Sequence, residues 1–338
     1  MFNVKYEKRF GFCPLVGTLG RHRGPGAAPQ MASSRASVAP RPLEGPQKPN
    51  FWRIRNIDIN ERELAEEWLC RQAQEAGLPK GVGYSLAADS ERTLSATVTS
   101  YSHPSPSQLA WFVDEEFDGL TPLYDREDAN VDIVAITGLD GHALGSFRSD
   151  DGGSVWLRDF APEDIPQARW MTYGYDSAVF GSENHSGIRE YADTCLRSLV
   201  RFRQRTNTTD RPLCFLCHNI GGIVLKEVLI KSSKAIEDGD DELGQILRVT
   251  HGLLFMGVPN LGLRHQQLVS VVQGKPNERL IRDLVVGKEQ EEPSQFLELL
   301  NEAFERLDRQ RRPPFEIMSY YETRSSPTAM VRTLRIGD

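Results

Sequence analysis

The chain has 338 residues, of which 39% are hydrophobic and 26% charged, as in globular proteins that bury a core. No stretch approaches the roughly 18 consecutive apolar residues that a membrane-spanning helix needs, so no transmembrane segment is expected. Residues 1–50 hold eight Lys and Arg against two acids, which leaves 32 bases and 45 acids, a net charge of −13, in the rest. An acidic body argues against nucleic acid as the partner.

The cysteines indicate a reducing compartment. Their positions lack the spacing of a disulfide framework or a zinc site, and Cys214-x-x-Cys217 lies within a predicted strand, where the two side chains point to opposite faces. The acidic run at 237–242 lacks the ligand spacing of a calcium loop, and we expect a solvated linker there. Composition therefore predicts a soluble intracellular protein that binds no metal or other cofactor.

Residues 1–50 form a basic tail rich in Pro and Gly. They have no hydrophobic periodicity and cannot bury enough surface to offset chain entropy, so we expect disorder. The arginines among them are also compatible with an organellar targeting segment, although Pro and Gly disfavour an amphipathic helix. Met31 is an alternative start of the protein.

Residues 51–112 are predicted to form a small separate α+β unit. The order is strand (52–57), helix (60–76), strand (82–86), strand (94–101) and a short helix near 109–112, which is a ferredoxin-like order. The strand at 94–101 lacks the stacked aromatic residues of RNA-recognition modules. Docking or packing is therefore the predicted role of this unit.

From residue 113 to 330 the pattern changes to alternating strands and helices, which predicts a doubly wound, mostly parallel sheet. The predicted strands and helices cover these ranges: 131–137, 156–160, 170–175, 188–200, 213–217, 223–235, 253–258, 268–272, 296–307 and 315–320. Right-handed crossovers bring the carboxyl ends of the strands to one edge of the sheet, where ligands usually bind. Residues 331–338 are a tail.

The segment at 217–222 reads Cys-His-Asn-Ile-Gly-Gly and has the layout of a nucleophile elbow, a sharp turn between a strand and a helix. A hydrolase of this design places serine on the turn. Here the residue is Asn219, whose amide has no hydroxyl for a base to deprotonate. The sequence thus predicts a catalytic corner without its nucleophile.

Several segments in this order resemble fungal α/β-hydrolase-like domains related to the serine-active-site-containing proteins and the DUF676 lipase-like group. They are 117–124 (FDGLTPLY), 131–143 (VDIVAITGLDGHA), 156–159 (WLRD), 173–177 (YGYDS), the elbow, 255–259 (FMGVP) and 320–323 (YYET). The resemblance implies an α/β-hydrolase fold and a lipase-like or esterase-like ancestry. It also implies association with mitochondrial or endoplasmic reticulum membranes.

Three departures from the family pattern bear on activity. Asn219 stands where the family has serine, and Asn260 stands where relatives often carry histidine. The fold's catalytic order is nucleophile, acid, histidine, with the acid implied at Glu322, yet the last histidine of the sequence is His265. The hydrolase domain is therefore expected to be incomplete at its C-terminal end. Glu322 is either the family acid or a surface carboxylate.

Other candidate residues have structural alternatives. Backbone N–H groups of Leu139 and Ile220 would form the oxyanion hole of an intact relative, but the glycines around Leu139 also suit a tight turn. His142 and His218 are expected to be structural. The loop serines Ser177, Ser182 and Ser186 lack a strained turn and an ordered base, so none is a convincing replacement nucleophile.

The leading hypothesis is a catalytically impaired hydrolase-like domain that acts as a binding or recognition module for a lipid, an acyl ester or a protein. The alternative is an active serine hydrolase, if Asn219 and the C-terminal end reflect an allelic change or a gene-model error. A third possibility is a scaffold in which residues 51–112 bind a partner protein.

Overall fold

The four-stranded sheet near the N-terminus is antiparallel throughout. We analysed a computed structural model of the chain, which describes residues 49–106, 110–149, 153–263, 266–285 and 294–320. Its first strands and helices are β1 (Asn50–Asp58), a 3-10 turn (Ile59–Glu61), α1 (Arg62–Glu75), β2 (Tyr84–Ala88), β3 (Thr93–Ser100) and β4 (Phe112–Asp114). The strand order β2-β3-β1-β4 is the ferredoxin-like order. The small α+β unit of the prediction is thus present.

The helix predicted near residues 109–112 was wrong for the described part of that range. Phe112 instead begins β4, which pairs with β1 through Phe112 opposite Arg55, Val113 opposite Ile54 and Asp114 opposite Arg53. Ion pairing explains why this segment forms a strand beside β1. Asp114 is buried and receives both Arg53, at 2.9 Å, and Arg55, at 3.0 Å, so the strand supplies the counter-charge of two β1 arginines.

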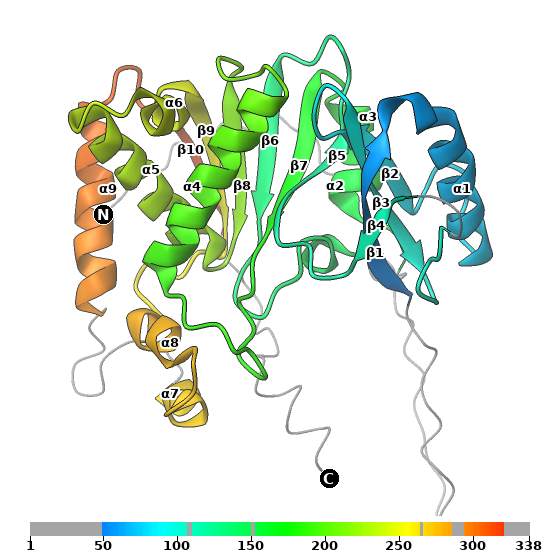
Figure 1. The fold of residues 1–338 in the computed structure, drawn as a ribbon. Coiled ribbons are helices and arrows are strands. Elements are labelled where there is room, and N and C mark those ends of the chain that lie inside the picture. Colours follow the sequence, from blue (N-terminus) through cyan, green and yellow to red (C-terminus); the bar gives the residue numbers. More distant parts are fainter. Residues whose placement is uncertain (1–48, 107–109, 150–152, 264–265, 286–293, 321–338) are drawn as a thin grey trace, which may run out of the picture. The chain divides into compact units, whose positions relative to one another are not determined.

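The larger sheet has six strands in the order β10-β9-β8-β6-β7-β5 (Figure 1). The strands are β5 (Gly119–Tyr124), β6 (Val131–Ile136), β7 (Ala168–Gly174), β8 (Leu213–His218), β9 (Thr250–Met256) and β10 (Glu316–Tyr320). All neighbours are parallel except β5, which pairs antiparallel with β7 at one edge. The predicted doubly wound, mostly parallel sheet is confirmed, and the architecture is that of an α/β-hydrolase fold.

Helices cover both faces of this sheet. One face packs under α4 (Ile188–Arg205), α5 (Gly221–Glu237), α6 (Asp241–Val249) and α9 (Gln295–Gln310), and the opposite face packs under α2 (Trp156–Asp159) and α3 (Ala161–Asp164). A short 3-10 turn (Gly145–Phe147), α7 (Gln266–Val272) and α8 (Glu278–Leu284) complete the described elements. Val134 and Ile136 face the first layer and Ala135 faces the second, which is the alternation of a strand buried on both sides.

The acidic run at 237–242 is more than the solvated linker that we predicted. Asp240 caps α6, because its carboxylate accepts a hydrogen bond from the Leu243 N–H at 3.0 Å. Asp241 and Glu242 occupy the first turn of that helix, where negative charge is favourable. The linker between the two helices is therefore short, because α5 ends at Glu237 and α6 begins at Asp241.

The small sheet packs against the antiparallel edge of the larger one. Arg53 of β1 donates hydrogen bonds to the Asp118 carbonyl and the Thr121 hydroxyl, both at 3.0 Å, and Asp159 of α2 accepts from the Gly83 N–H at 3.1 Å. All of the described residues belong to one compact unit. The boundary near residue 112 stays a prediction, and these contacts show how closely the two sheets are joined.

Candidate functional site

The elbow at residue 219 lies at the carboxyl edge of the sheet, between β8 and α5. The strand and the helix predicted on either side of it are both present. Asn219 has a φ of 53°, in the left-handed region that asparagine tolerates better than most residues. Its backbone N–H donates to the Met256 carbonyl of β9 at 2.9 Å, which ties the turn to the neighbouring strand. The backbone thus keeps the sharp turn of a nucleophile elbow.

The two glycines after the turn allow the helix to start against the sheet. A Cβ atom on Gly221 would lie 2.5 Å from the Thr137 carbonyl oxygen and 2.6 Å from that of Ile136. On Gly222 it would lie 2.4 Å from a methyl group of Val258. Any side chain here would push α5 away from β6, so glycine is required for the close approach.

The Asn219 side chain turns back onto its own chain. Its Oδ1 accepts a hydrogen bond from the Ile220 N–H at 2.7 Å. In a hydrolase of this fold, the N–H of the residue after the nucleophile is one of the oxyanion donors. In this protein the corresponding N–H already has an acceptor, supplied by Asn219 at the position where the nucleophile was expected.

The loop that follows β6 forms the other wall of the corner. Gly138 is pressed against the elbow, because a Cβ atom there would lie 2.4 Å from the Asn219 Cβ. The loop is held by Ser177, whose hydroxyl donates to the Gly138 carbonyl at 2.8 Å and whose carbonyl accepts from the Asp140 N–H at 3.0 Å. Gly138 and Asn219 are in contact. The residues that follow them, Leu139 and Ile220, are the two implied oxyanion donors. The structure therefore brings the two backbone segments together.

His142 anchors this loop through its ring. Its Nδ1 accepts hydrogen bonds from the N–H groups of Leu144 and Gly145, at 3.1 and 3.0 Å, so that nitrogen carries no proton. The other nitrogen, Nε2, lies 3.3 Å from the Glu115 carbonyl oxygen and donates to it. Burial lowers the pKa of the ring. A neutral ring with both nitrogens engaged fixes the loop and offers no base to the elbow.

No nearby side chain among those described takes over as a nucleophile. Ser177 is buried with its hydroxyl donated to a carbonyl, and Ser182 donates to the Asp176 carboxylate at 2.7 Å. Cys217, two residues before the elbow, is fully buried, and that burial raises the pKa of its thiol well above the usual value. A thiol in that setting stays protonated and inert at neutral pH.

The loop after β9 is held by a buried lysine. Lys226 of α5 donates from Nζ to Oδ1 of Asn260 at 2.7 Å and to Oδ1 of Asn301 at 2.8 Å. The Asn301 amide in turn donates to the Asn260 carbonyl at 2.8 Å. Burial lowers the pKa of Lys226 to about 8. Asn260, expected where relatives often carry histidine, is thus an amide acceptor for this lysine.

Two residues that the sequence analysis named cannot be placed. Glu322, the implied acid, and His265 lie outside the described residues, as do residues 1–48 of the basic tail. His218 lies at the end of β8. Sequence reasoning missed the hydrogen bond between Asn219 and the Ile220 N–H. The left-handed preference of asparagine was the available signal for the turn, whereas the rotamer that makes the bond leaves no trace in the sequence.

Within the described part of the chain, no group of three or more His, Cys, Asp or Glu side chains could hold a metal ion. The helices described there also include none that is long and apolar enough to cross a bilayer.

The fold and the turn at residue 219 define the class, an α/β-hydrolase-like fold. No protein-family model matches the chain. It is 25% identical over 232 residues to Protein SERAC1 of Bos taurus, a match that covers 62% of this chain and 33% of that protein. It is 24% identical over 174 residues to Protein SERAC1 of Homo sapiens, covering 45% of this chain and 26% of that one. The chain spans about a third or less of the length of these relatives.

Solved structures with similar chain traces include the Bacillus licheniformis lipase BlEst2 in mature form, with a TM-score of 0.33 and 12% identity over 59% of this chain and 70% of that one. Esterase B from Lactobacillus rhamnosis in a C6-C4 SN3 inhibited form gives a TM-score of 0.32 and 12% identity, covering 78% of this chain and 82% of that one.

Proposed function

We propose that this protein is a hydrolase-like domain without hydrolytic turnover, which uses the carboxyl edge of its sheet to recognise a ligand or partner. The observation that carries the proposal is the hydrogen bond from the Ile220 N–H to the Asn219 side chain at 2.7 Å. Asn219 supplies no hydroxyl oxygen for attack, and its side chain also accepts the hydrogen bond of the N–H that would stabilise an oxyanion. Both halves of acyl transfer at this corner are therefore lost together.

The electrostatic consequence follows from the position of that bond. Stabilising a tetrahedral intermediate requires donors that are free and aimed at the developing oxyanion, and losing one such donor costs about 10²–10³ in kcat. Here an incoming oxyanion would first have to displace a neutral amide oxygen from its partner. A carbonyl-bearing ligand could still bind beside the loop at Leu139, but the site would not drive it toward reaction.

The intact turn suggests what the corner now binds. The chain keeps a left-handed residue 219 and the two tightly packed glycines, so the backbone of the elbow is retained while its chemistry is blocked. Hydrolases of this fold use such a turn for acyl chemistry, so an ester or lipid acyl group is the ligand that we propose. The alternative role is recognition of a partner protein through the small sheet. In that case the partner would bind whether or not an ester ligand is present.

The direct test is a comparison of the unmodified protein with Asn219→Ser and Asn219→Ala, using short-chain 4-nitrophenyl esters and a fluorophosphonate probe. We expect no turnover and no labelling of the unmodified protein or of Asn219→Ala. Labelling of Asn219→Ser at residue 219 would show that the machinery around the corner is otherwise complete, whereas its absence would mean that more than the nucleophile is lost.

Either result with Asn219→Ser is compatible with a silent natural protein. The proposal is refuted if the unmodified protein turns over esters and that activity disappears on changing a residue other than Asn219. Ester binding without turnover, measured by protection of the unmodified protein against thermal unfolding, is the positive result that we expect.

The resemblance to serine-active-site-containing proteins also supports a place at a mitochondrial or endoplasmic reticulum membrane. Fractionation of cells that express the tagged full chain checks this part of the proposal. Recovery away from both organelles would remove it without affecting the argument about Asn219.

A further inference from the structure

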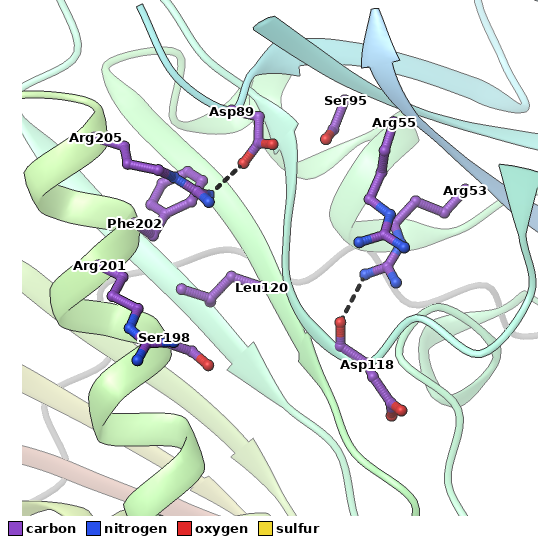
Figure 2. Close-up of a pocket in the computed structure, with 10 residues that line it drawn as sticks. All are labelled: Arg53, Arg55, Asp89, Ser95, Asp118, Leu120, Ser198, Arg201, Phe202 and Arg205. Atoms are coloured by element: carbon purple, nitrogen blue, oxygen red, sulfur yellow. Dashed lines mark hydrogen bonds and ion pairs between the residues drawn. The ribbon is translucent and has the colours of Figure 1, made fainter. Parts of the chain in front are cut away.

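A cavity lies away from the elbow, between the small sheet and helix α4. It has a volume of about 220 Å³, and ten residues line it: Arg53, Arg55, Asp89, Ser95, Asp118, Leu120, Ser198, Arg201, Phe202 and Arg205. Figure 2 shows Arg53 and Arg55 entering from one side and Arg201 and Arg205 from α4 on the other. Four guanidinium groups therefore share one small cavity with two carboxylates, which gives the lining a net positive charge.

The arginines differ in how fully the protein already uses them. Arg53 is buried and its donors are engaged by Asp114, the Asp118 carbonyl and Thr121. Such an arginine is a fixed part of the wall. Arg205 is half exposed and pairs with Asp89 at 2.7 Å, at the rim of the cavity.

Two other arginines have donors to spare. Arg55 bonds Asp114 through Nε at 3.0 Å and lies over the Phe112 ring, so its two terminal nitrogens are left for a ligand. Arg201 is exposed on α4, and its guanidinium forms no ion pair or hydrogen bond with the described residues. Paired terminal nitrogens of this kind match the oxygens of a phosphate in a bidentate manner.

A serine adds a polar group to the cavity. Ser95 is only 2% exposed and lines the cavity, and within the described chain its hydroxyl forms no hydrogen bond. Two positions further along β3, the Thr97 hydroxyl bonds Ser85 at 2.7 Å. The Ser95 oxygen is not fully enclosed, so it is open to an acceptor bound in the cavity.

We propose that this cavity is a binding site for a phosphate monoester group. Drug-sized ligands occupy roughly 300–1,000 Å³, so this smaller space suits one charged headgroup and not an acyl chain. The polar lining and the excess of guanidinium over carboxylate favour an anion with several oxygens. The same chemistry could come from a soluble phosphate ester or from the headgroup of a lipid, and the site is independent of the proposed role of the elbow.

The test titrates the full chain by calorimetry with inorganic phosphate and with glycerol 3-phosphate, and measures co-sedimentation with phosphatidylcholine vesicles that contain or lack phosphatidic acid. We expect saturable binding in the soluble arm, the phosphatidic acid arm or both. Binding only to phosphatidic acid vesicles would identify the lipid headgroup as the source. Absence of binding in both arms would overturn the proposal.

Arg201→Gln is the variant that tests the site, because Arg201 has no internal partner whose loss would disturb folding. Its matched control is Arg197→Gln, which removes the same charge from an exposed position on the same helix outside the cavity. We expect Arg201→Gln to weaken binding about tenfold and Arg197→Gln to leave it nearly unchanged. Equal losses from the two variants would indicate general charge attraction and contradict a built site.

A chemical readout on the unmodified protein guards against a folding artefact. Phenylglyoxal modifies accessible arginines, and bound phosphate should protect Arg201 and Arg55 while Arg197 continues to react. Mass spectrometry of the digested protein reports each site. Unprotected Arg201 at a saturating phosphate concentration would overturn the proposal.

Discussion

Buried polar groups differ between the two ends of the parallel strands in the large sheet, called here the amino edge and the carboxyl edge. At the amino edge, the fully buried Asp132 of β6 accepts hydrogen bonds from Arg169 at 2.9 and 2.6 Å, from Arg203, and from Arg211 at 3.2 Å. At the carboxyl edge, the central polar group is the neutral amide of Asn219, which bonds the next N–H of its own chain.

The comparison separates structural chemistry from functional chemistry. Charges at the amino edge are matched and enclosed, and Thr206 and Thr208 take up further donors of Arg169. Burial still lowers the pKa of Arg203 to about 10, although Asp132 opposes that shift. The carboxyl edge has a left-handed turn and two tightly packed glycines, and among the described residues there is no charged group of that kind at its centre. The perturbed pKa of a buried arginine thus marks a structural cluster here, and the site is marked by its backbone.

The largest expected effect is at the amino edge. Asp132→Asn would leave several guanidinium groups around a neutral residue in a buried setting, and breaking such a cluster costs about 3–5 kcal/mol. The free energy of unfolding in urea measures this cost. The matched control is Asp128→Asn, which breaks the exposed pair with Arg126 at 2.9 Å and should change stability little. Similar losses from both variants would mean that the buried cluster is not a stabilising centre.

The carboxyl edge can be tested by its packing. Gly138→Ala places a Cβ atom 2.4 Å from the Asn219 Cβ, which should destabilise the protein by about 1–3 kcal/mol. Asn219→Gly removes that atom and suits the φ of 53°, so the alanine should cost distinctly less in this background. Urea unfolding of the two single variants and the double variant gives the coupling. Additive effects would show that the loop and the elbow do not touch.

The third test concerns pH and Lys226, the buried cation near the carboxyl edge whose hydrogen-bond partners in the described chain are amides. Its pKa is lowered to about 8 in the folded protein from an ordinary value of 10.5, so between these pH values the unfolded chain binds the extra proton. Stability should therefore rise with pH in this window, with a contribution approaching about 1.4 kcal/mol per pH unit.

The free energy of unfolding is measured from pH 7 to 10 for the unmodified protein and for Lys226→Met. The variant lacks the titrating group, so the rise in stability with pH that is due to Lys226 should be absent from it. Lys231→Met is the control: Lys231 lies on the same helix but pairs with Asp193 at 3.0 Å, so the rise due to Lys226 should persist in that variant. Parallel curves for the unmodified protein and Lys226→Met would contradict the assignment.

Much of the fold could be predicted because the central strands are apolar on both faces. The ranges expected for β6, β7, β8 and β9 differ from the observed strands by only a few residues. Strand β5 was not predicted as a strand, since Pro122 and Thr121 interrupt its apolar pattern and its pairing with β7 at the sheet edge comes from distant residues. Helix α6 was missed because its cap lies in an acidic run that resembles a linker.

The candidate sites also differ in how far local sequence predicts them. The layout of the elbow follows from local signals, namely an apolar run, a turn residue and two glycines. The phosphate cavity does not, because it joins residues of β1 and β3 to residues of α4 that lie more than 100 positions further along the chain. No periodicity or motif connects Ser95 to Arg201, so this cavity could be found only in three dimensions.

The sequence by itself determined that the corner between β8 and α5 carries an amide at residue 219 and that two glycines follow the turn. Only the tertiary structure decided that this amide takes the Ile220 N–H, that Asp132 gathers three arginines, and that Lys226 meets amides in place of carboxylates. The physical reason is that chemical identity and turn propensity are local, whereas partnership and burial depend on side chains that approach only when the sheet and its helices are assembled.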